Sequence, residues 1–236
     1  MLEADAKIKF EVAQKNFENK SYKKAQELWL EILDYYPKNL SVLRNVALAF
    51  YHDDDLEKAQ MILKKIIKIN KKEPRALVML ILILERQDKI DETMKYIDLG
   101  LKENILDKHW EVKKELMLPT IFEDVKDIDE SRNKLLKYIQ EVLESNKKIS
   151  LNMDSQLIKP VQFNLSYSQH DNLEINKKCA SFFRKIYPQL NNVHKLKNTS
   201  NSKIRIGFVS DYLTDHTIGK LFKGIILNLD KNKFDI

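Results

Sequence analysis

Cysteine, glycine and long apolar runs are all scarce in this sequence. Cys179 is the single cysteine, so no disulfide can form within the chain, which fits a reducing cytosol and argues against a disulfide-stapled secreted protein. The densest apolar stretch, Ala76 to Leu84, has nine residues, whereas a membrane-spanning helix needs about 20. The first residues, Met1 to Asp5, are partly acidic, unlike the basic and then apolar start of a secretory signal. We therefore expect a cytoplasmic protein without membrane contact.

Only four glycines occur in 236 residues, and three of them, Gly207, Gly219 and Gly224, lie near the C-terminal end. Glycine weakens helix interiors, so the long glycine-poor region, rich in lysine, glutamate, leucine and isoleucine, favours helices. A different kind of structure begins near Lys203. The composition therefore predicts a mostly α-helical protein with a distinct C-terminal segment.

Neither sign of charge dominates, since 41 lysines and arginines stand against 35 aspartates and glutamates, for a net charge of +6. The lysines are interspersed with acidic residues, as on solvated helices with many i,i+4 pairs. Aromatic residues do not alternate with the lysines as a base-stacking surface requires. A solvated helical surface is the favoured interpretation. A basic nucleic-acid binder stays as an alternative that salt-dependent association would reveal.

A repeat of 34 residues organises the first hundred residues. Shifting the sequence by this amount aligns small or apolar residues in three copies. The aligned sets are Ala13, Ala47 and Ile81; Ala25, Ala59 and Thr93; and Trp29, Leu63 and Ile97. Each copy has apolar residues at helical spacing on both sides of a polar turn, at 18–21, 52–55 and 86–89. Each copy therefore predicts two helices joined by a short turn.

This pattern resembles the tetratricopeptide repeat, whose period is about 34 residues. Ala13 matches the small residue of its first helix. Ala25 and Trp29 match the small and aromatic positions of its second helix, and Pro37 matches the closing proline. The second copy has Lys71 in place of that proline, and the third departs further. The resemblance implies stacked repeats with a concave groove that holds a peptide or partner protein; the other interpretation is one wall of a larger body.

The region between the repeats and the C-terminal segment predicts helices and loops with little chemistry. His170 and Cys179 could form a thiol–base pair, but no third group orients them, and a buried structural cysteine is favoured. His52 precedes three aspartates, yet the calcium-loop pattern is absent, so we interpret this stretch as a turn. His109 and His194 lack metal-ligand spacing. We expect no metal site.

The C-terminal segment has the pattern of the start of an α/β domain. Residues 203–210 alternate as a strand, a polar turn follows, a helix begins near Thr217, and Phe234–Ile236 begins another strand. A parallel sheet requires more strands and helices on both faces. We therefore expect an incomplete Rossmann-like lobe, from a truncated gene product or a fragment of a longer protein. Phosphate-loop and dinucleotide-binding glycine patterns are absent from the sequence.

This segment resembles the start of the catalytic region of the O-linked N-acetylglucosamine transferases and their bacterial Spindly-like relatives. The matching residues are the strand Ile206–Ser210, His216 at the start of a helix, and the strand Lys233–Ile236. Thr217 stands where the family often has proline.

The resemblance implies a transferase that moves N-acetylglucosamine from UDP-N-acetylglucosamine to protein side chains without a metal or other cofactor. It makes His216 a candidate base or a residue of the active-site cleft. The residues alone leave another interpretation open, in which His216 and Asp215 cap the helix. Most of the family's donor-binding machinery belongs to a second lobe that this sequence lacks. We therefore expect the chain alone to be inactive.

Together these patterns predict a mostly α fold: a tetratricopeptide-type α-solenoid over residues 1–104, a helical linker region over 105–202, and the incomplete start of a Rossmann-like glycosyltransferase lobe over 203–236. The expected function is that of the N-terminal part of a protein glycosyltransferase. Its repeats would bind the acceptor protein or peptide, while the complete enzyme binds the UDP-sugar. The alternative is a non-catalytic tetratricopeptide adaptor that binds partner proteins.

Overall fold

A computed structural model describes residues 2–146, 149–151, 162–168, 170–192 and 203–236. The chain divides into two compact units, Met1–Asn191 and Asn192–Ile236, and each is described by itself. His194 and most of the polar segment 191–202 lie outside the described residues.

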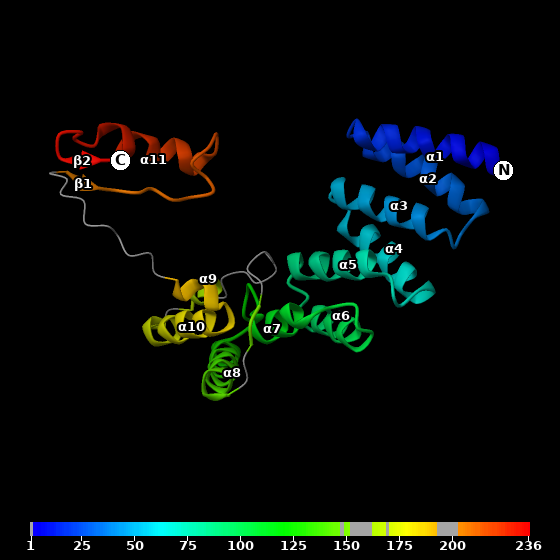
Figure 1. Ribbon diagram of the computed structural model, residues 1–236. Helices are drawn as coiled ribbons and strands as arrows, with labels where there is room; N and C mark the ends of the chain where they lie inside the picture. The colour runs from blue at the N-terminus through cyan, green and yellow to red at the C-terminus, as the bar shows by residue number, and fades with distance from the viewer. Residues whose placement is uncertain (1, 147–148, 152–161, 169, 193–202) are drawn as a thin grey trace. The chain divides into compact units, whose positions relative to one another are not determined.

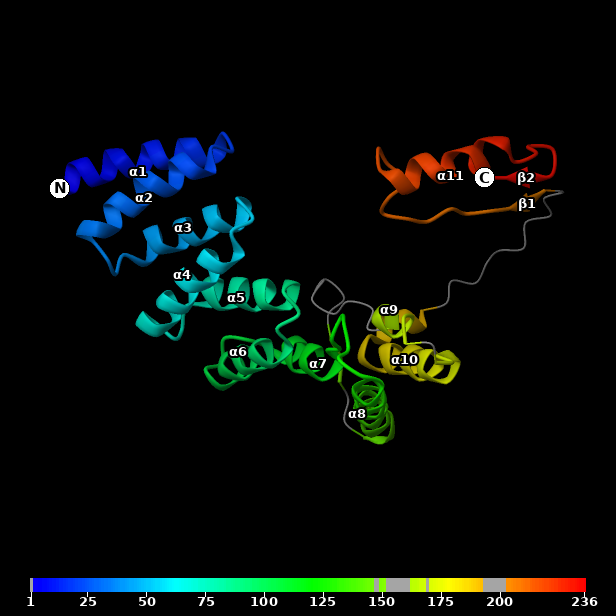
Figure 2. The ribbon, with the colours of Figure 1, turned by 180° about the vertical axis from the view of Figure 1, so that it is seen from behind.

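The N-terminal unit begins with a series of helices, each of which contacts the next (Figures 1 and 2). They are α1 (Glu3–Glu18), α2 (Tyr22–Tyr35), α3 (Leu40–His52), α4 (Leu56–Ile69), α5 (Pro74–Arg86), α6 (Ile90–Lys102) and α7 (Lys108–Leu116). The helices of each pair are separated at the polar turns that the 34-residue pattern predicts. The predicted helix–turn–helix organisation of the repeats is therefore confirmed.

The turn inside each repeat has the same backbone geometry three times. Lys20, Asp54 and Asp88, which are 34 residues apart, all have a positive φ, of 60°, 62° and 57°. In each turn the amide of the next residue donates to the carbonyl five residues earlier, at 2.9 Å. This left-handed residue and its closing hydrogen bond end the first helix of the pair and reverse the chain. The repeat is thus a repeat of geometry as well as of apolar positions.

The aligned positions form the centre of the first hydrophobic core. Nine residues, three from each repeat, are almost completely buried: Ala13, Ala25, Trp29, Ala47, Ala59, Leu63, Ile81, Thr93 and Ile97. Thr93 satisfies its buried hydroxyl by donating to the carbonyl of Lys89 at 2.8 Å. The departures in the third repeat therefore keep the burial that the pattern requires.

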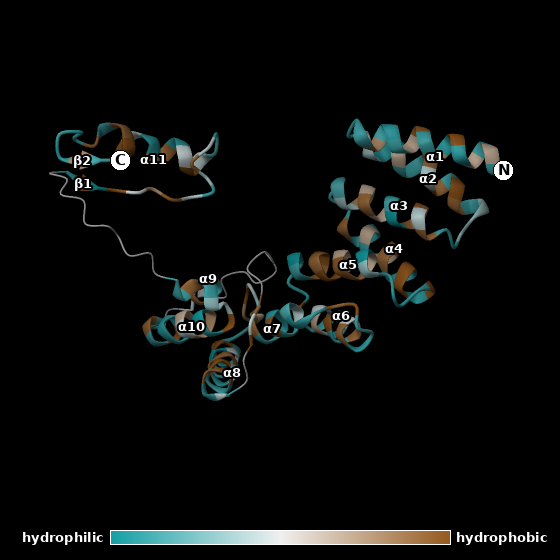
Figure 3. Cartoon of the chain, viewed as in Figure 1, coloured by the Kyte–Doolittle hydropathy of each residue, from teal (hydrophilic) through white to brown (hydrophobic). Residues whose placement is uncertain are grey.

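The nine-residue apolar run of the sequence, Ala76 to Leu84, lies in α5, which is brown over much of its length in Figure 3. This helix contacts both α4 and α6. Because it is covered by helices on two sides, it buries more of its circumference than an amphipathic surface helix does. The run is a core helix of the solenoid.

A second hydrophobic core follows the repeats. It contains α8 (Val125–Glu144), which contacts α10 (Leu173–Ile186); the short helices α9 (Gln162–Leu165) and η1 (Pro188–Asn191) lie along the same stretch of chain. The helix α7 contributes to both cores, since Trp110 packs in the first while Val112 and Leu116 pack in the second.

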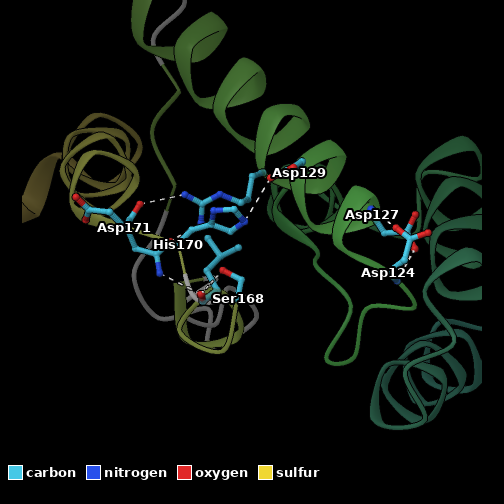
Figure 4. A network of polar contacts seen from close by, with 9 residues as sticks. Asp124, Asp127, Asp129, Ser168, His170 and Asp171 are labelled. Carbon is cyan, nitrogen blue, oxygen red and sulfur yellow. Dashed lines mark hydrogen bonds and ion pairs between the residues drawn. The ribbon is translucent and has the colours of Figure 1, made fainter.

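The start of α8 is set by two aspartates that cap it reciprocally. The cap is Asp124, whose carboxylate accepts from the amide of Asp127 at 3.0 Å, while the Asp127 carboxylate accepts from the amide of Asp124 at 3.3 Å (Figure 4). This reciprocal capping box adds one turn at the N-terminus of the helix.

The C-terminal unit contains two short parallel strands joined through a helix. β1 (Ile204–Arg205) pairs with β2 (Phe234–Asp235), with Ile204 opposite Phe234, and α11 (Thr217–Asn228) lies between them in the chain. The predicted helix is confirmed. The predicted strand over 203–210 is too long, because β2 offers only two residues for pairing. Two such strands do not confirm a Rossmann-like lobe.

Candidate functional site

A groove of about 600 Å³ lies on the second helices of the first two repeats. Its lining combines apolar, charged and amide side chains. Its lining comes from α2 (Lys23, Gln26, Glu27 and Leu30), from the end of α3 (Phe50 and Asp53), and from α4 with its cap (Asp55, Lys58, Met61 and Ile62). We call it the inter-repeat groove.

Lys58 and Asp55 are held together at one side of the inter-repeat groove. The ammonium of Lys58 lies 2.7 Å from the Asp55 carboxylate, which also caps α4 by accepting from the Lys58 amide at 3.1 Å. These hydrogen bonds from Lys58 lower the pKa of the Asp55 carboxyl. The same ammonium lies 5.4 Å from the centre of the Phe50 ring, a cation–π distance. Lys58 is therefore committed to its own helix terminus rather than to α2.

Gln26 lines the inter-repeat groove with an unused donor. Its side chain is 7% exposed. Its Nε2 makes no hydrogen bond to any residue that the structure describes. A buried donor without an acceptor costs about 1–3 kcal/mol. The position is therefore suited to a ligand that supplies an acceptor.

Side chains bridge the equivalent space between the second and third repeats. Gln60, which is 34 residues after Gln26, donates its Nε2 to Oε1 of Gln87. Lys64 forms an ion pair with Glu92 at 2.7 Å, linking α4 to α6. Two side-chain pairs therefore bridge this second space.

The inter-repeat groove is open because the residues at the four equivalent positions cannot form those pairs. Gln87 corresponds to Asp53, which has a shorter side chain, and Lys64 corresponds to Leu30, which has no charge. Glu92 corresponds to Lys58, so the charge at that position is reversed. Sequence analysis did not single out these residues. The signal that could have found them was a comparison of the polar positions in the 34-residue alignment.

Acidic side chains dominate the end of the inter-repeat groove near the α3–α4 turn. A second hollow of about 530 Å³ shares Asp53 and Asp55 with the groove and adds Asp54 and Glu57. Asp54 is paired with Arg86 at 3.0 Å. The carboxylates of this turn create a locally acidic surface on a chain whose net charge is +6.

His216 is exposed and forms the N-cap of α11. Its Nδ1 accepts from the amide of Ile218 at 3.2 Å, and its ring centre lies 4.6 Å from that of Tyr212. Asp215 instead pairs with Lys220 at 2.9 Å. The geometry is that of the capping interpretation, with His216 as the capping residue. The catalytic role stays a prediction.

The cap also limits what the His216 ring can do in this conformation. A neutral imidazole has one accepting nitrogen, and here Nδ1 uses it for the Ile218 amide. Nε2 then carries the hydrogen and is a donor. To accept a proton from a substrate, the ring would first have to release the helix terminus.

The other histidines have structural surroundings. His52 stacks on Tyr22, with ring centres 5.2 Å apart, and belongs to the aromatic cluster at the end of the first repeat. His170 lies 3.4 Å from Asp129 (Figure 4). Cys179 is buried in the second core. The favoured interpretation of Cys179 as a buried residue is therefore confirmed.

The part of the chain that the structure describes holds neither a candidate metal-binding cluster nor a membrane-spanning helix. Within it, no group of three or more histidine, cysteine, aspartate or glutamate residues could hold a metal ion. Within it also, no helix combines the length and the apolar character needed to cross a membrane.

No model of a known protein family matches the chain, and no curated protein matches it. Among solved structures, it is similar to the first tetratricopeptide repeat domain of Spaghetti (RPAP3) bound to an HSP90 peptide, with 17% identity, a TM-score of 0.41, and 46% of this chain and 86% of that chain covered. It is similar to the Sgt2 tetratricopeptide domain of Aspergillus fumigatus, with 16% identity, a TM-score of 0.40, and 64% and 89% covered. It is also similar to PilF of Pseudomonas aeruginosa, with 16% identity, a TM-score of 0.37, and 58% and 59% covered.

The geometry of the N-terminal unit defines its class. Helix pairs with a period of 34 residues, the same left-handed turn in each and small residues between their helices are the architecture of tetratricopeptide repeats. The chain is therefore a repeat protein over α1–α6.

Proposed function

We propose that the repeats bind a segment of a partner protein in the inter-repeat groove, so that the chain acts as a protein-binding adaptor. The observation that carries this proposal is the open groove between α2 and α4, where the next repeat has two bridging side-chain pairs.

The scaffold supports such a role because its helices are held rigidly by the first core. Each repeat packs only against its neighbours, so the groove walls are fixed by the same contacts that stabilise the solenoid. A preformed surface loses little entropy when a peptide binds. The groove also combines apolar, hydrogen-bond-donating and acidic groups, which together can recognise an extended segment.

The test is a selection of random peptides on the immobilised full chain, followed by affinity measurements with a matched pair of variants. Leu30→Lys places a charge on the groove wall and should weaken binding of the selected peptides by about tenfold or more. Ile69→Lys makes the same change at a residue with the same exposure, 39%, outside the groove lining. It should leave the affinity unchanged. Equal affinity of both variants and the unchanged chain would contradict the proposal.

We infer as a second candidate that the C-terminal unit belongs to a glycosyltransferase catalytic region like that of the O-linked N-acetylglucosamine transferases, with UDP-N-acetylglucosamine as the donor. The motif residues carry this candidate, and the parallel pairing of β1 and β2 around α11 is compatible with it. In this candidate His216 would release the Ile218 amide before it accepts a proton, and the repeats would hold the acceptor protein.

The test for this candidate is an assay of UDP-N-acetylglucosamine hydrolysis and transfer with the chain alone, where no turnover is expected. His216→Asn is the informative variant because asparagine also caps helices but cannot act as the base. Robust turnover by the chain alone would overturn the expectation of inactivity. If that turnover survived His216→Asn, it would also exclude His216 as a catalytic residue.

A further inference from the structure

The inter-repeat groove differs in charge and chemistry from the rest of the chain. We propose that its occupant is an extended peptide segment in which an apolar side chain is followed, within a few residues, by lysine or arginine. This inference rests on the proposed adaptor function and specifies the partner's chemistry.

The apolar part of the groove requires an apolar side chain from the ligand. Leu30 on α2 and Met61 on α4 both line the groove, and they are 39% and 68% exposed. Such exposure of large apolar side chains on both walls is relieved when a ligand covers them. Methionine also adapts its shape to different apolar partners. This end of the groove therefore selects for a leucine-like or aromatic side chain without fixing which one.

The Gln26 side-chain amide is a candidate partner for the ligand backbone. Gln26 lines the groove, and its Nε2 is buried beneath the surface with no acceptor among the described residues. A main-chain carbonyl of an extended peptide is an acceptor that every peptide carries. A rotation of the Gln26 side chain towards the groove would let Nε2 donate to such a carbonyl, and the new hydrogen bond would add affinity without sequence preference.

The carboxylates of the α3–α4 turn are the reason that the proposed ligand carries a lysine or arginine. Asp54 is paired with Arg86, and Asp55 with Lys58. The Asp53 backbone amide donates to the carbonyl of Ala49 at 3.0 Å. Its carboxylate makes no hydrogen bond or ion pair to any residue that the structure describes, although its charge acts on the nearby Lys58 ammonium. Asp53 lines both hollows. A lysine or arginine of the ligand would supply its missing partner.

Charge also argues against the other occupants. An acidic peptide would place a carboxylate against the turn, where Asp53 is unpaired and Glu57 adds a further negative charge. A nucleic-acid backbone would meet the same repulsion. The chain as a whole is basic, so general attraction of anions would act elsewhere on its surface and not in the groove.

The first experiment reads the sequence preference of peptides selected from a random library on the full chain. An apolar residue followed by lysine or arginine should be enriched. The charge-reversed variant Asp53→Lys should shift the selection towards aspartate or glutamate. This variant is compatible with the fold because Asp53 is the C-cap of α3, where a positive charge is favourable.

The second experiment closes the groove by introducing the residue types that bridge the equivalent space in the next repeat. The triple variant Leu30→Lys, Asp53→Gln and Lys58→Glu places at these positions the residue types of Lys64, Gln87 and Glu92. It leaves the net charge unchanged, and the new side chains can pair as they do between α4 and α6. We expect a loss of affinity of about tenfold or more, with helix content by circular dichroism unchanged.

A charge-matched control separates closure of the groove from a general change of surface. It combines Asp34→Gln, Ile69→Lys and Lys68→Glu, which are outside the groove lining, and it should bind as the unchanged chain does. If the triple groove variant also binds unchanged, the groove is not the site.

The outcomes distinguish this inference from the function on which it rests. Selected peptides that lose binding in the Leu30→Lys and triple variants, but show no basic residue, would overturn the peptide chemistry and leave the adaptor function standing. A consensus of acidic peptides would also overturn the proposed peptide chemistry and leave the adaptor function standing. A library that yields no peptide above a control protein would overturn both.

Discussion

Gly100 and Leu106 together occupy a position that one isoleucine fills in each of the two preceding repeats. Ile32 and Ile66 are buried at the equivalent sites, 68 and 34 residues earlier. At residue 100 a Cβ would lie 2.5 Å from Cδ1 of Leu106, so the leucine side chain takes the space of the missing one. The third repeat therefore keeps its packing with a residue from the connection to α7. The glycine of α6 is required by this close approach.

Gly100→Ala should consequently destabilise the protein by about 1–3 kcal/mol, as overpacking of a core does. Helix propensity alone predicts the opposite sign, a gain of up to about 1 kcal/mol. The free energy of unfolding, measured by chemical denaturation, decides between the two. In a background that carries Leu106→Ala, the same substitution should be tolerated much better. A stabilising Gly100→Ala in the unchanged background would show that Leu106 does not pack as described.

The repeats could be predicted from the sequence because their signal is local and periodic. Ala25 and Ala59 are small where two helices approach, and the polar turns fall at the same phase of the 34-residue period. Any single turn would be weak evidence, but three turns at one spacing are strong. The left-handed residue was not predicted, since lysine and aspartate at Lys20, Asp54 and Asp88 do not mark a positive φ as glycine does.

The groove and the C-terminal unit were harder to predict for different physical reasons. Whether Gln26 finds a partner depends on Asp53, which is near in space but on another helix. The strand near Lys203 is limited by the length of its neighbour β2, which the alternation of its own residues does not encode. His216 could be predicted as a helix start, and its cap through Nδ1 needed coordinates.

Asp88 ties the loop before α8 to the turn of the third repeat. Its carboxylate accepts from the amide of Thr120 at 2.8 Å and from that of Ile121 at 3.2 Å. Asp88→Gly keeps the positive φ but removes the acceptor. The free energy of local opening at these two amides should therefore fall by about 1–2 kcal/mol. Their hydrogen exchange should become correspondingly faster.

The matched control for this change is Asp54→Gly, at the equivalent turn of the second repeat, where the carboxylate pairs with Arg86. It should leave exchange at Thr120 and Ile121 unaltered. Equal acceleration by both variants would mean that the loop responds to general loosening of the repeats rather than to the Asp88 carboxylate.

Lys113 and Glu85 form the most buried ion pair described between α7 and the repeats. Their charged groups are 2.6 Å apart, and the side chains are 6% and 23% exposed. Lys113 also lies 5.2 Å from the centre of the Trp110 ring. Glu85→Gln leaves the Lys113 charge without its partner, and Lys113 is the less exposed of the two side chains. The substitution should therefore cost about 3 kcal/mol of stability.

Lys113→Met should cost less, because the remaining carboxylate can still reach water and the methionine keeps the apolar contacts. The double variant should be more stable than the sum of the two single losses implies, and a double-mutant cycle measures that difference. Strictly additive losses would show that the pair contributes no coupling between α7 and α5.

Tyr138 makes the stability of the second core sensitive to alkaline pH. Burial, with smaller contributions from Glu115 and Glu111, raises the pKa of its hydroxyl from 10.0 to about 12. The folded protein holds this proton more tightly than the unfolded chain, so stability is complete below pH 10.0 and is lost as the pH rises towards about 12. The loss attributable to this group should be about 1–2 kcal/mol.

Tyr138→Phe should flatten the decline of the free energy of unfolding over that pH range, measured by denaturant titration at fixed pH values. The ring contact with Phe182, whose centre is 5.8 Å away, does not need the hydroxyl, so stability at neutral pH should change little. Burial also raises the pKa of Tyr187, so a smaller decline should remain and should disappear further when Tyr187→Phe is added. If Tyr138→Phe leaves the alkaline slope unchanged, the hydroxyl is solvated in the folded protein and its burial does not set the pH response of this core.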